Sequence, residues 1–382
     1  MRNETHSLRS FEAAFGAARS AIRAAALGVM LALSGCAAYH TIPPAGYSAV
    51  EPRHQVMRVA FDMFGEPYPV SRDANDTTFP PQQRRSSNTA FSVRSHYRRL
   101  GRPYEPEAIL DAWAAEIRAS LSARPGGRVV FLIKGFNNSS GGLTDDYAAT
   151  RDRIASLGGT DHLIFIEVLW DAFYRGRGTA PLPLAYFADS ITSSLLAGTC
   201  GLRPLLGRLP EGTNVTLITH SRGGAIALAA FTKANIYAPR QCPVPPVPSQ
   251  LGNVRAVAFA PALGDGIIRR DDNGDGRAEL AADLFDQLDR LYVGFNPRDP
   301  ATAKRYFGVS IGARRGGDTR LASDRAYLAE VEGQSAGRMQ HVEFSHPSHP
   351  LQNYLRNEAL TRCLLWAGQI IEERPADCGL AR

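Results

Sequence analysis

One serine of this chain stands where a nucleophile could be presented. Residues 219–224 read Thr-His-Ser-Arg-Gly-Gly, directly after an apolar strand-like run and before an alanine-rich helical stretch. A serine at a strand-to-helix turn can adopt a strained backbone that exposes its hydroxyl, and the following helix N-terminus stabilises negative charge. Serine is also a common helix N-cap, but this context favours Ser221 as a nucleophile that attacks a carbonyl carbon.

A serine hydroxyl is a poor nucleophile near neutral pH without a base beside it. Three histidines lie near the C-terminal end: His341 within an expected strand, and His346 and His349 in the loop before the last expected helix. The residues alone leave His346 and His349 as candidates for the base. His220, next to the serine, is expected to point the other way and to pack in the core.

A third group must orient the histidine and stabilise its charged form. Asp299 follows the strand-like run 291–295, and Asp265 follows the run 254–260. A carboxylate at a strand end often serves only the turn. We favour Asp299 as the acid, because it follows the later strand, and keep Asp265 as the second choice.

A loop with a glycine and two asparagines leaves the first strong strand. Residues 133–139 read Ile-Lys-Gly-Phe-Asn-Asn-Ser. Together with the serine turn, this loop resembles the α/β-hydrolase superfamily. The nucleophile elbow of that superfamily reads G-x-S-x-G, with Thr219 as its first small residue here. Its lipase- and esterase-like members carry an H-G-F/Y-N loop, with Lys134 in place of the histidine here.

The resemblance implies roles for particular residues. The backbone N–H groups of Phe136 and Arg222 would hold the oxyanion that forms during acyl transfer. The chain order would be serine, acid, histidine, with the base in the loop directly before the last helix, and this favours His349 over His346. The implied triad is therefore Ser221, His349 and Asp299.

The elements that must position these residues alternate along the chain. Almost continuous Val/Ile/Leu runs separated by amphipathic stretches predict an α/β fold, with a mostly parallel sheet covered on both faces by helices. This is the α/β-hydrolase architecture that the resemblance implies. The expected strands are residues 128–133, 163–169, 215–219, 254–260, 291–295 and 339–344, with 56–61 as a further candidate. The expected helices are 105–122, 144–157, 184–196, 223–236, 278–288 and 351–373.

The N-terminal segment resembles the signal of a bacterial lipoprotein. Arginines precede an apolar run of about ten residues, too short to span a bilayer, and the run ends in Leu-Ser-Gly-Cys at residues 33–36. The resemblance implies diacylglycerol on the Cys36 thiol, cleavage before Cys36 and acylation of the new N-terminus. Several acyl chains give a durable membrane anchor. Because Ala37 is not aspartate, the resemblance favours the outer membrane, facing the periplasm.

The chain is expected to divide into three parts: a signal peptide over 1–35, a tether and irregular region over 36–104, and a catalytic domain over 105–382. Removal of the signal peptide lowers the formal net charge from +6 to +4. The basic residues are scattered, which fits solubility or attraction to anionic headgroups and not a nucleic-acid surface. No later stretch reaches the length of a second membrane span.

Four cysteines remain after Cys36. An even number in an oxidising compartment predicts two disulfides, for which the sequence allows three pairings. We favour Cys200–Cys242 and Cys363–Cys378, because both close local loops. Four buried free thiols are the alternative.

A partial calcium motif lies at residues 271–276, which read Asp-Asp-Asn-Gly-Asp-Gly. Asp271, Asn273 and Asp275 occupy the first three ligand positions of a calcium loop, with a glycine at position six. The usual acid at position twelve is replaced by Ala282. A structural Ca²⁺ ion and an ion-free acidic turn therefore both remain open, and no cofactor is expected to be required.

These observations predict a serine hydrolase that cleaves carboxylic esters through an acyl-enzyme, lipase- or carboxylesterase-like. Its partners would be an ester or lipid small molecule and, through the lipid anchor, the membrane, with no nucleic acid. A fold does not name its function, so an inactive hydrolase-fold lipoprotein serving as an envelope binding or assembly module is the alternative. Lys134 and Thr219 leave room for it.

Overall fold

The computed structural model describes residues 37–39, 56–69, 92–136, 140–158, 160–171, 173–175, 190–233, 242, 246–263, 266–275, 277–302, 305–306, 309–310 and 320–382. The predicted signal peptide, the lipidation residue Cys36 and the alternative acid Asp265 lie outside these residues. Within them, no helix is long and apolar enough to cross a bilayer.

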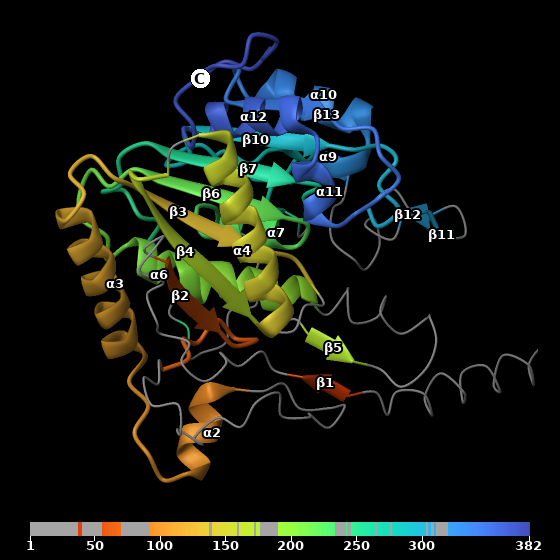
Figure 1. Ribbon diagram of the computed structural model, residues 1–382. Helices are drawn as coiled ribbons and strands as arrows, with labels where there is room; N and C mark the ends of the chain where they lie inside the picture. Colours follow the sequence, from red (N-terminus) through yellow and green to blue (C-terminus); the bar gives the residue numbers. More distant parts are fainter. Residues whose placement is uncertain are drawn as a thin grey trace, which may run out of the picture.

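A seven-stranded sheet in which every strand pair is parallel forms the centre of the molecule (Figure 1). Its order from one edge is β2 (Val56–Phe61), β4 (Leu163–Trp170), β3 (Arg128–Ile133), β6 (Val215–His220), β7 (Val254–Phe259), β10 (Arg290–Phe295) and β13 (Met339–Glu343). All predicted strands are present. Because β2 is the edge strand, the folded domain begins before residue 105, the boundary expected from the sequence.

The central strands have buried side chains on both faces, which is why their sequences are mostly apolar. In β3, Val129, Phe131 and Ile133 join one core cluster, while Val130 and Leu132 join the other. Burial of a large aliphatic or aromatic side chain contributes roughly 1.5–3 kcal/mol. The apolar strands therefore account for much of the stability of the frame that carries the site.

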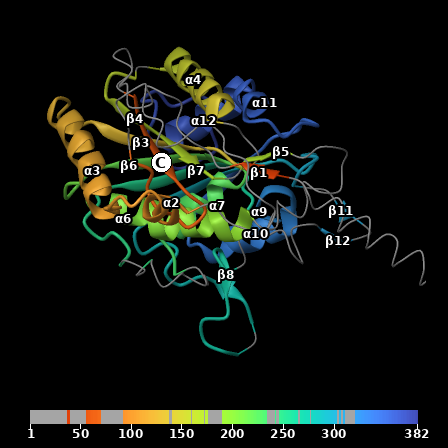
Figure 2. The ribbon, with the colours of Figure 1, turned by 90° about the horizontal axis from the view of Figure 1, so that it is seen from below.

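Helices cover both faces of the sheet (Figure 2). On one face lie α3 (Pro106–Ser122), α6 (Arg203–Leu206), α7 (Gly223–Ala229) and α10 (Arg325–Gln334). On the other lie α4 (Ser140–Leu157), α11 (Leu351–Leu355) and α12 (Glu358–Ala367). The chain therefore has an α/β-hydrolase fold, as the sequence predicted.

The strand order reverses between β3 and β6. From β3 the chain moves to β4 toward one edge, whereas β6, β7, β10 and β13 follow one another toward the other edge. In open parallel sheets, ligands bind outside the carboxyl ends of the strands at such a reversal. The loop after β3 and the turn after β6, which carry the candidate residues, flank this point.

Not every helix prediction matches the structure. The helix expected over 223–236 ends at Ala229 in α7, and a turn follows over 230–232. The helix expected over 278–288 is wrong: Glu279 and Leu280 form a short strand, β9 (Glu279–Leu280), paired with β8 (Arg269–Arg270), and turns follow. The carboxylate of Asp283 pairs with Arg270 and accepts the backbone N–H of Lys233 at 2.5 Å, so tertiary contacts outweigh local helix propensity. The helix expected over 351–373 is two helices, because the side chain of Asn357 caps α12.

Both favoured disulfides are confirmed. Cys200 pairs with Cys242 and Cys363 pairs with Cys378. They close sequence separations of 42 and 15 residues, for which loop-closure entropy gives stabilisation of about 4 and about 3 kcal/mol. The second bridge holds the C-terminal segment against α12.

Candidate active site

The turn after β6 holds Ser221 in a left-handed conformation, with φ of 54°. Such a conformation costs a residue other than glycine roughly 1–2 kcal/mol. Three backbone hydrogen bonds hold it: the Ser221 N–H donates to Phe259, and the Ser221 carbonyl accepts from Gly224 and Ala262, at 3.0 to 3.1 Å. The strained strand-to-helix turn expected from the sequence is therefore present.

Glycines let the loop after β3 contact this turn. A Cβ on Gly223 would lie 2.1 Å from the carbonyl oxygen of Ile133. A Cβ on Gly135 would lie 2.7 Å from the Cβ of Ser221 and 2.9 Å from the backbone nitrogen of Arg222. The two segments predicted to form the oxyanion hole are thus in direct contact, and neither position has room for a side chain.

Lys134 holds this loop through its backbone and its side chain. It stands at the position where the family resemblance expects histidine. Its backbone N–H donates to the hydroxyl of Tyr147 at 2.9 Å, and its carbonyl accepts the indole N–H of Trp170 at 2.9 Å. Its ammonium group pairs with Asp146, while burial lowers the pKa of Lys134 to about 8. Phe136 follows and is described, whereas the loop residues 137–139 are not.

The side chain of Arg222 binds a neighbouring loop, and its backbone N–H lies in the turn. The guanidinium group is fully buried and donates to the carbonyl of Leu263 at 2.9 Å. The backbone N–H of Arg222 lies beside Gly135, at the start of α7. Its place in the turn fits the oxyanion role that the sequence resemblance implies.

The structure brings Asp299 and His349 together. The Nδ1 atom of His349 lies 2.8 Å from Oδ2 and 3.0 Å from Oδ1 of Asp299. Asp299 follows β10 in a turn whose backbone N–H groups at Ala301 and Thr302 donate to Oδ1, and the hydroxyl of Tyr354 donates to Oδ2 at 2.5 Å. Burial raises the pKa of Asp299, but the hydrogen bonds from His349 and Tyr354 outweigh it and hold the pKa below its usual value.

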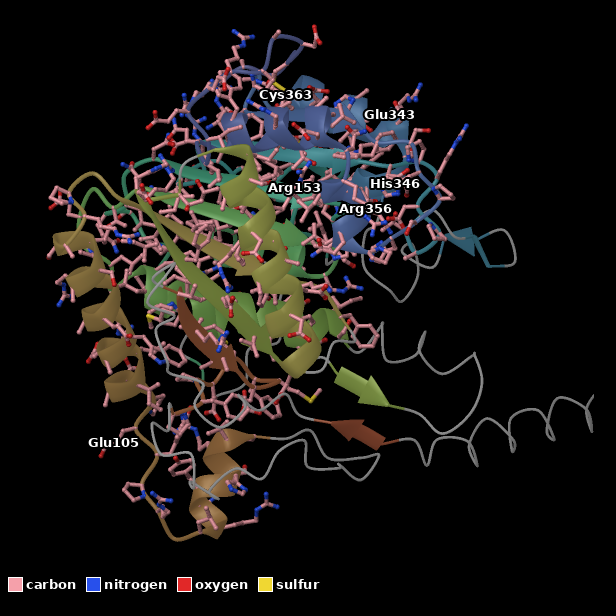
Figure 3. The ribbon with its side chains drawn as sticks, in the orientation of Figure 1. Glu105, Arg153, Glu343, His346, Arg356 and Cys363 are labelled. Atoms are coloured by element: carbon pink, nitrogen blue, oxygen red, sulfur yellow. A yellow bond between two sulfur atoms is a disulfide. The ribbon has the colours of Figure 1, made fainter. Side chains whose placement is uncertain are left out.

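His346, the second candidate base, lies apart from this pair. Its ring packs edge-on against Tyr354 with centroids 4.4 Å apart, and its Nε2 is buried without a hydrogen bond to any described residue. Figure 3 shows His346 on the side of the molecule where α11 lies. His341, in β13, contacts Glu332 at 2.8 Å. Of the three C-terminal histidines, His349 is the one that contacts Asp299.

Sequence reasoning missed three residues of this network. Tyr354 donates to Asp299, and the side-chain amide of Asn296 donates to the Tyr354 hydroxyl at 3.2 Å and to the His346 carbonyl at 3.0 Å. His220 was expected only to pack, yet its Nε2 lies 2.8 Å from the carbonyl oxygen of His349. Asn296 stands in the same turn as Asp299, and this was the one signal in the sequence that could have pointed to it.

Comparisons with known proteins found distant similarity to solved structures. No model of a known protein family matches the chain, and no curated protein matches it in sequence. Among solved structures, it is similar to esterase 2 of Thermogutta terrifontis phosphoramylated by tabun, with 15% identity and a TM-score of 0.35, over 66% of this chain and 88% of that one. The native form of that esterase shows 15% identity and a TM-score of 0.32, over 67% and 86%.

The partial calcium motif lies in an exposed loop between β8 and β9. Within it, Asp272 pairs with Arg270 at 2.7 Å, and an Asp275 oxygen accepts the backbone N–H of Arg277 at 2.8 Å. Among the described residues, no group of three or more His, Cys, Asp or Glu side chains is placed to hold a metal ion. Calcium binding through Asp271, Asn273 and Asp275 stays a prediction.

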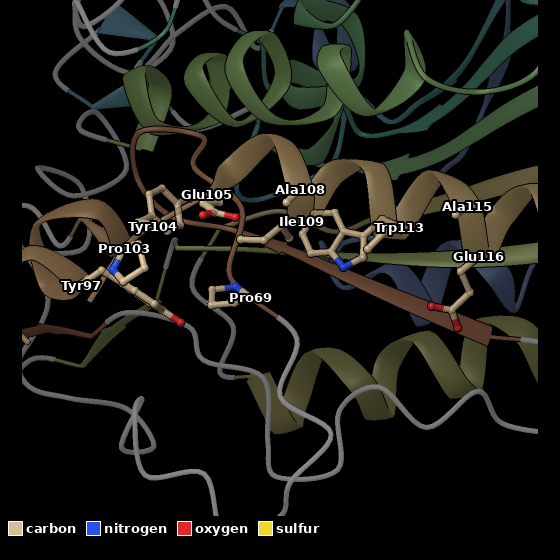
Figure 4. A pocket seen from close by; sticks show the side chains of 11 residues that line it. Pro69, Tyr97, Pro103, Tyr104, Glu105, Ala108, Ile109, Trp113, Ala115 and Glu116 are labelled. Carbon is tan, nitrogen blue, oxygen red and sulfur yellow. The ribbon is translucent and has the colours of Figure 1, made fainter. Parts of the chain in front are cut away.

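A cavity of about 900 Å³ lies beside α3 (Figure 4). Tyr104, Ile109 and Trp113 contribute its apolar lining. Glu105 lines the same cavity, and Figure 3 places it on the opposite side of the molecule from His346. None of the candidate catalytic residues lines this cavity.

The Tyr354 hydroxyl offers a test of the acid's environment. Tyr354→Phe removes one donor to the Asp299 carboxylate, a hydrogen bond to a charged group that contributes about 1.5–3 kcal/mol. We expect kcat for ester hydrolysis to fall about tenfold or more. The loss of unfolding free energy should be full above about pH 5 and shrink on acidification, because a depressed carboxyl pKa stabilises the fold only while the group is ionised.

A matched control for this change is Tyr292→Phe. The Tyr292 side chain is as buried as that of Tyr354, but its hydroxyl donates to the carbonyl of Ala381 at 3.0 Å, away from Asp299. This variant should keep the kcat of the wild type. Equal activity in both variants would show that the hydroxyl of Tyr354 does not act through Asp299.

Proposed function

We propose that the protein is a serine hydrolase that cleaves carboxylic esters, lipase- or carboxylesterase-like, through a Ser221–His349–Asp299 triad. The observation that carries the proposal is the contact of His220 and His349. The residue next to the strained serine lies 2.8 Å from the carbonyl of the one C-terminal histidine that is paired with a buried carboxylate. This contact supports a site in which the proposed nucleophile, base and acid meet at the carboxyl ends of the strands.

In the proposed acylation step, His349 takes the proton of the Ser221 hydroxyl as Oγ attacks the ester carbonyl carbon. Asp299 stabilises the imidazolium that forms and holds the ring in the tautomer with its Nδ1 protonated. The carbonyl oxygen becomes an oxyanion that accepts hydrogen bonds from the backbone N–H groups of Phe136 and Arg222. When the tetrahedral intermediate collapses, His349 returns the proton to the leaving alcohol, and the acyl group stays on Ser221.

Deacylation repeats these steps with water. His349 removes a proton from the water molecule, whose oxygen attacks the acyl carbon, and the same backbone N–H groups stabilise the second oxyanion. The proton returns to the Ser221 oxygen as the carboxylic acid leaves. The reaction requires no cofactor.

The proposed setting is the bacterial cell envelope. An acylated Cys36 would anchor the enzyme in the outer membrane, with its folded domain in the periplasm. Its substrate there would be an ester or lipid small molecule. The two disulfides support an oxidising compartment, because disulfides form and persist there. A structural Ca²⁺ ion at residues 271–276 is a further part of the proposal, and calorimetric titration with Ca²⁺ tests it.

Covalent labelling tests the proposed function directly. The folded wild-type protein should react with a fluorophosphonate probe, and mass spectrometry should place the adduct on Ser221. It should also hydrolyse p-nitrophenyl esters, and rates across rising acyl-chain length would define lipase or carboxylesterase preference. Heat-denatured protein is the control for non-specific labelling. A folded protein that neither labels nor hydrolyses any ester of the series would be the inactive binding module instead.

A further inference from the structure

We propose that His220 is a positioning residue that holds the backbone of His349 in place from the nucleophile's own strand. This inference rests on the proposed function and extends it to a residue outside the triad. His220 is the last residue of β6, directly before Ser221, and only 4% of it is exposed. Its Nε2 lies 2.8 Å from the carbonyl oxygen of His349.

The geometry determines the tautomer of His220. A carbonyl oxygen only accepts hydrogen bonds, so Nε2 of His220 must carry the proton. Its Nδ1 is buried and makes no hydrogen bond to any described residue. A second proton there would create a buried charge with no partner, which is costly. The ring is therefore neutral, with its one proton directed at His349.

Burial and the nearby positive charges favour the neutral form of His220. Burial lowers the pKa of His220 well below its usual value, and the charged form of His349 lowers it further. The hydrogen bond to the His349 carbonyl raises the pKa of His220, but less than burial and the charged His349 lower it; the ammonium group of Lys134 lowers it and the Asp299 carboxylate raises it by smaller amounts. The rings of His220 and His349 lie 4.7 Å apart. When His349 becomes charged during catalysis, the ring beside it therefore adds no second positive charge.

The contact completes a two-point attachment of the base. Asp299 holds the side chain of His349 at Nδ1, and His220 holds its carbonyl oxygen. Since His220 and Ser221 are consecutive, the second attachment ties the base to the backbone that carries the nucleophile. Without it, the ring could swing about its contact with Asp299, and a misplacement of about 1 Å can lower a rate about 100-fold.

A pair of variants separates the hydrogen bond from the packing of the ring. In His220→Gln, the side-chain N–H₂ group stands the same number of bonds from Cα as Nε2 of histidine, so the donor is kept. In His220→Met, a chain of similar length has no donor. We expect His220→Met to lower kcat for p-nitrophenyl butyrate about 10- to 30-fold with little change in KM. We expect His220→Gln to recover most of this loss.

The possible outcomes are distinct. Equal kcat in His220→Met and the wild type would overturn the proposal, and so would an equal loss in both variants that parallels a lower melting temperature, because either result denies the donor a role. If the wild type itself fails to label with the fluorophosphonate probe, the proposed function fails, and this inference falls with it. Support requires a labelled wild type, a slow Met variant of near-normal melting temperature and rescue by glutamine.

Discussion

Replacing Ser221 with alanine is expected to lower kcat for p-nitrophenyl ester hydrolysis by about 10⁴-fold or more. The low activity that remains would come from substrate positioning and oxyanion stabilisation alone. The reason is that no acyl-enzyme can form without Oγ. Steady-state rates and fluorophosphonate labelling measure the loss. The protein should remain folded, because the backbone hydrogen bonds that hold the turn at Phe259 and Ala262 do not involve the hydroxyl.

Two further variants make this experiment specific. Ser120→Ala removes a hydroxyl that donates to the carbonyl of Glu116 within α3, and it should leave rate and labelling unchanged. Ser221→Gly should be as inactive as Ser221→Ala but more stable by about 0.5–1 kcal/mol, because glycine adopts the observed φ of 54° without steric cost. Undiminished labelling of Ser221→Ala would mean that another residue is the nucleophile.

The sheet could be predicted because its strands are buried on both faces. In β3 and β6 every side chain is buried, so both sequences are rich in Val, Ile and Leu without the alternation of a half-exposed strand. The order in which strands pair is harder to obtain, since it depends on contacts distant in sequence. The clearest case is β2, which pairs with β4 across more than one hundred residues. Its neighbours in sequence are polar and suggested a tether.

The failed helix shows the opposite situation. Residues 278–288 have helical periodicity, but their carboxylates are used by distant partners. The carboxylate of Asp283 pairs with Arg270 and accepts the backbone N–H of Lys233 at 2.5 Å. Local propensity carries no information about such partners.

The geometry of the candidate site could be predicted where it depends on one turn, and could not be predicted where several loops meet. The strained turn at Ser221 follows from a strand, a serine and two glycines in succession. The choice between His346 and His349 depends on which ring reaches Asp299, and that depends on the turn after β10 and on Tyr354 in α11. The contact of His220 with the His349 carbonyl joins segments 129 residues apart, and no local sequence pattern predicts it.

Gly135→Ala is expected to lower kcat about 10²- to 10³-fold, the cost of losing one oxyanion donor. The added Cβ would lie 2.7 Å from the Cβ of Ser221, 2.9 Å from the backbone nitrogen of Arg222 and 3.0 Å from the carbonyl oxygen of His220. Two of these three neighbours are backbone atoms of a turn fixed on both sides, so the loop after β3 must move instead. Its movement would carry the Phe136 N–H away from the position of the oxyanion.

Gly333→Ala is the matched control, since a Cβ at that position in α10 meets nothing within 4 Å. This variant should keep full activity and gain up to about 1 kcal/mol of stability, because alanine favours a helix over glycine. Both variants add one methyl group, so the comparison isolates the contact between the loop and the turn. Full activity in a folded Gly135→Ala protein would exclude the loop after β3 from oxyanion stabilisation. The oxyanion would then need a second N–H donor, in addition to that of Arg222, from another part of the chain.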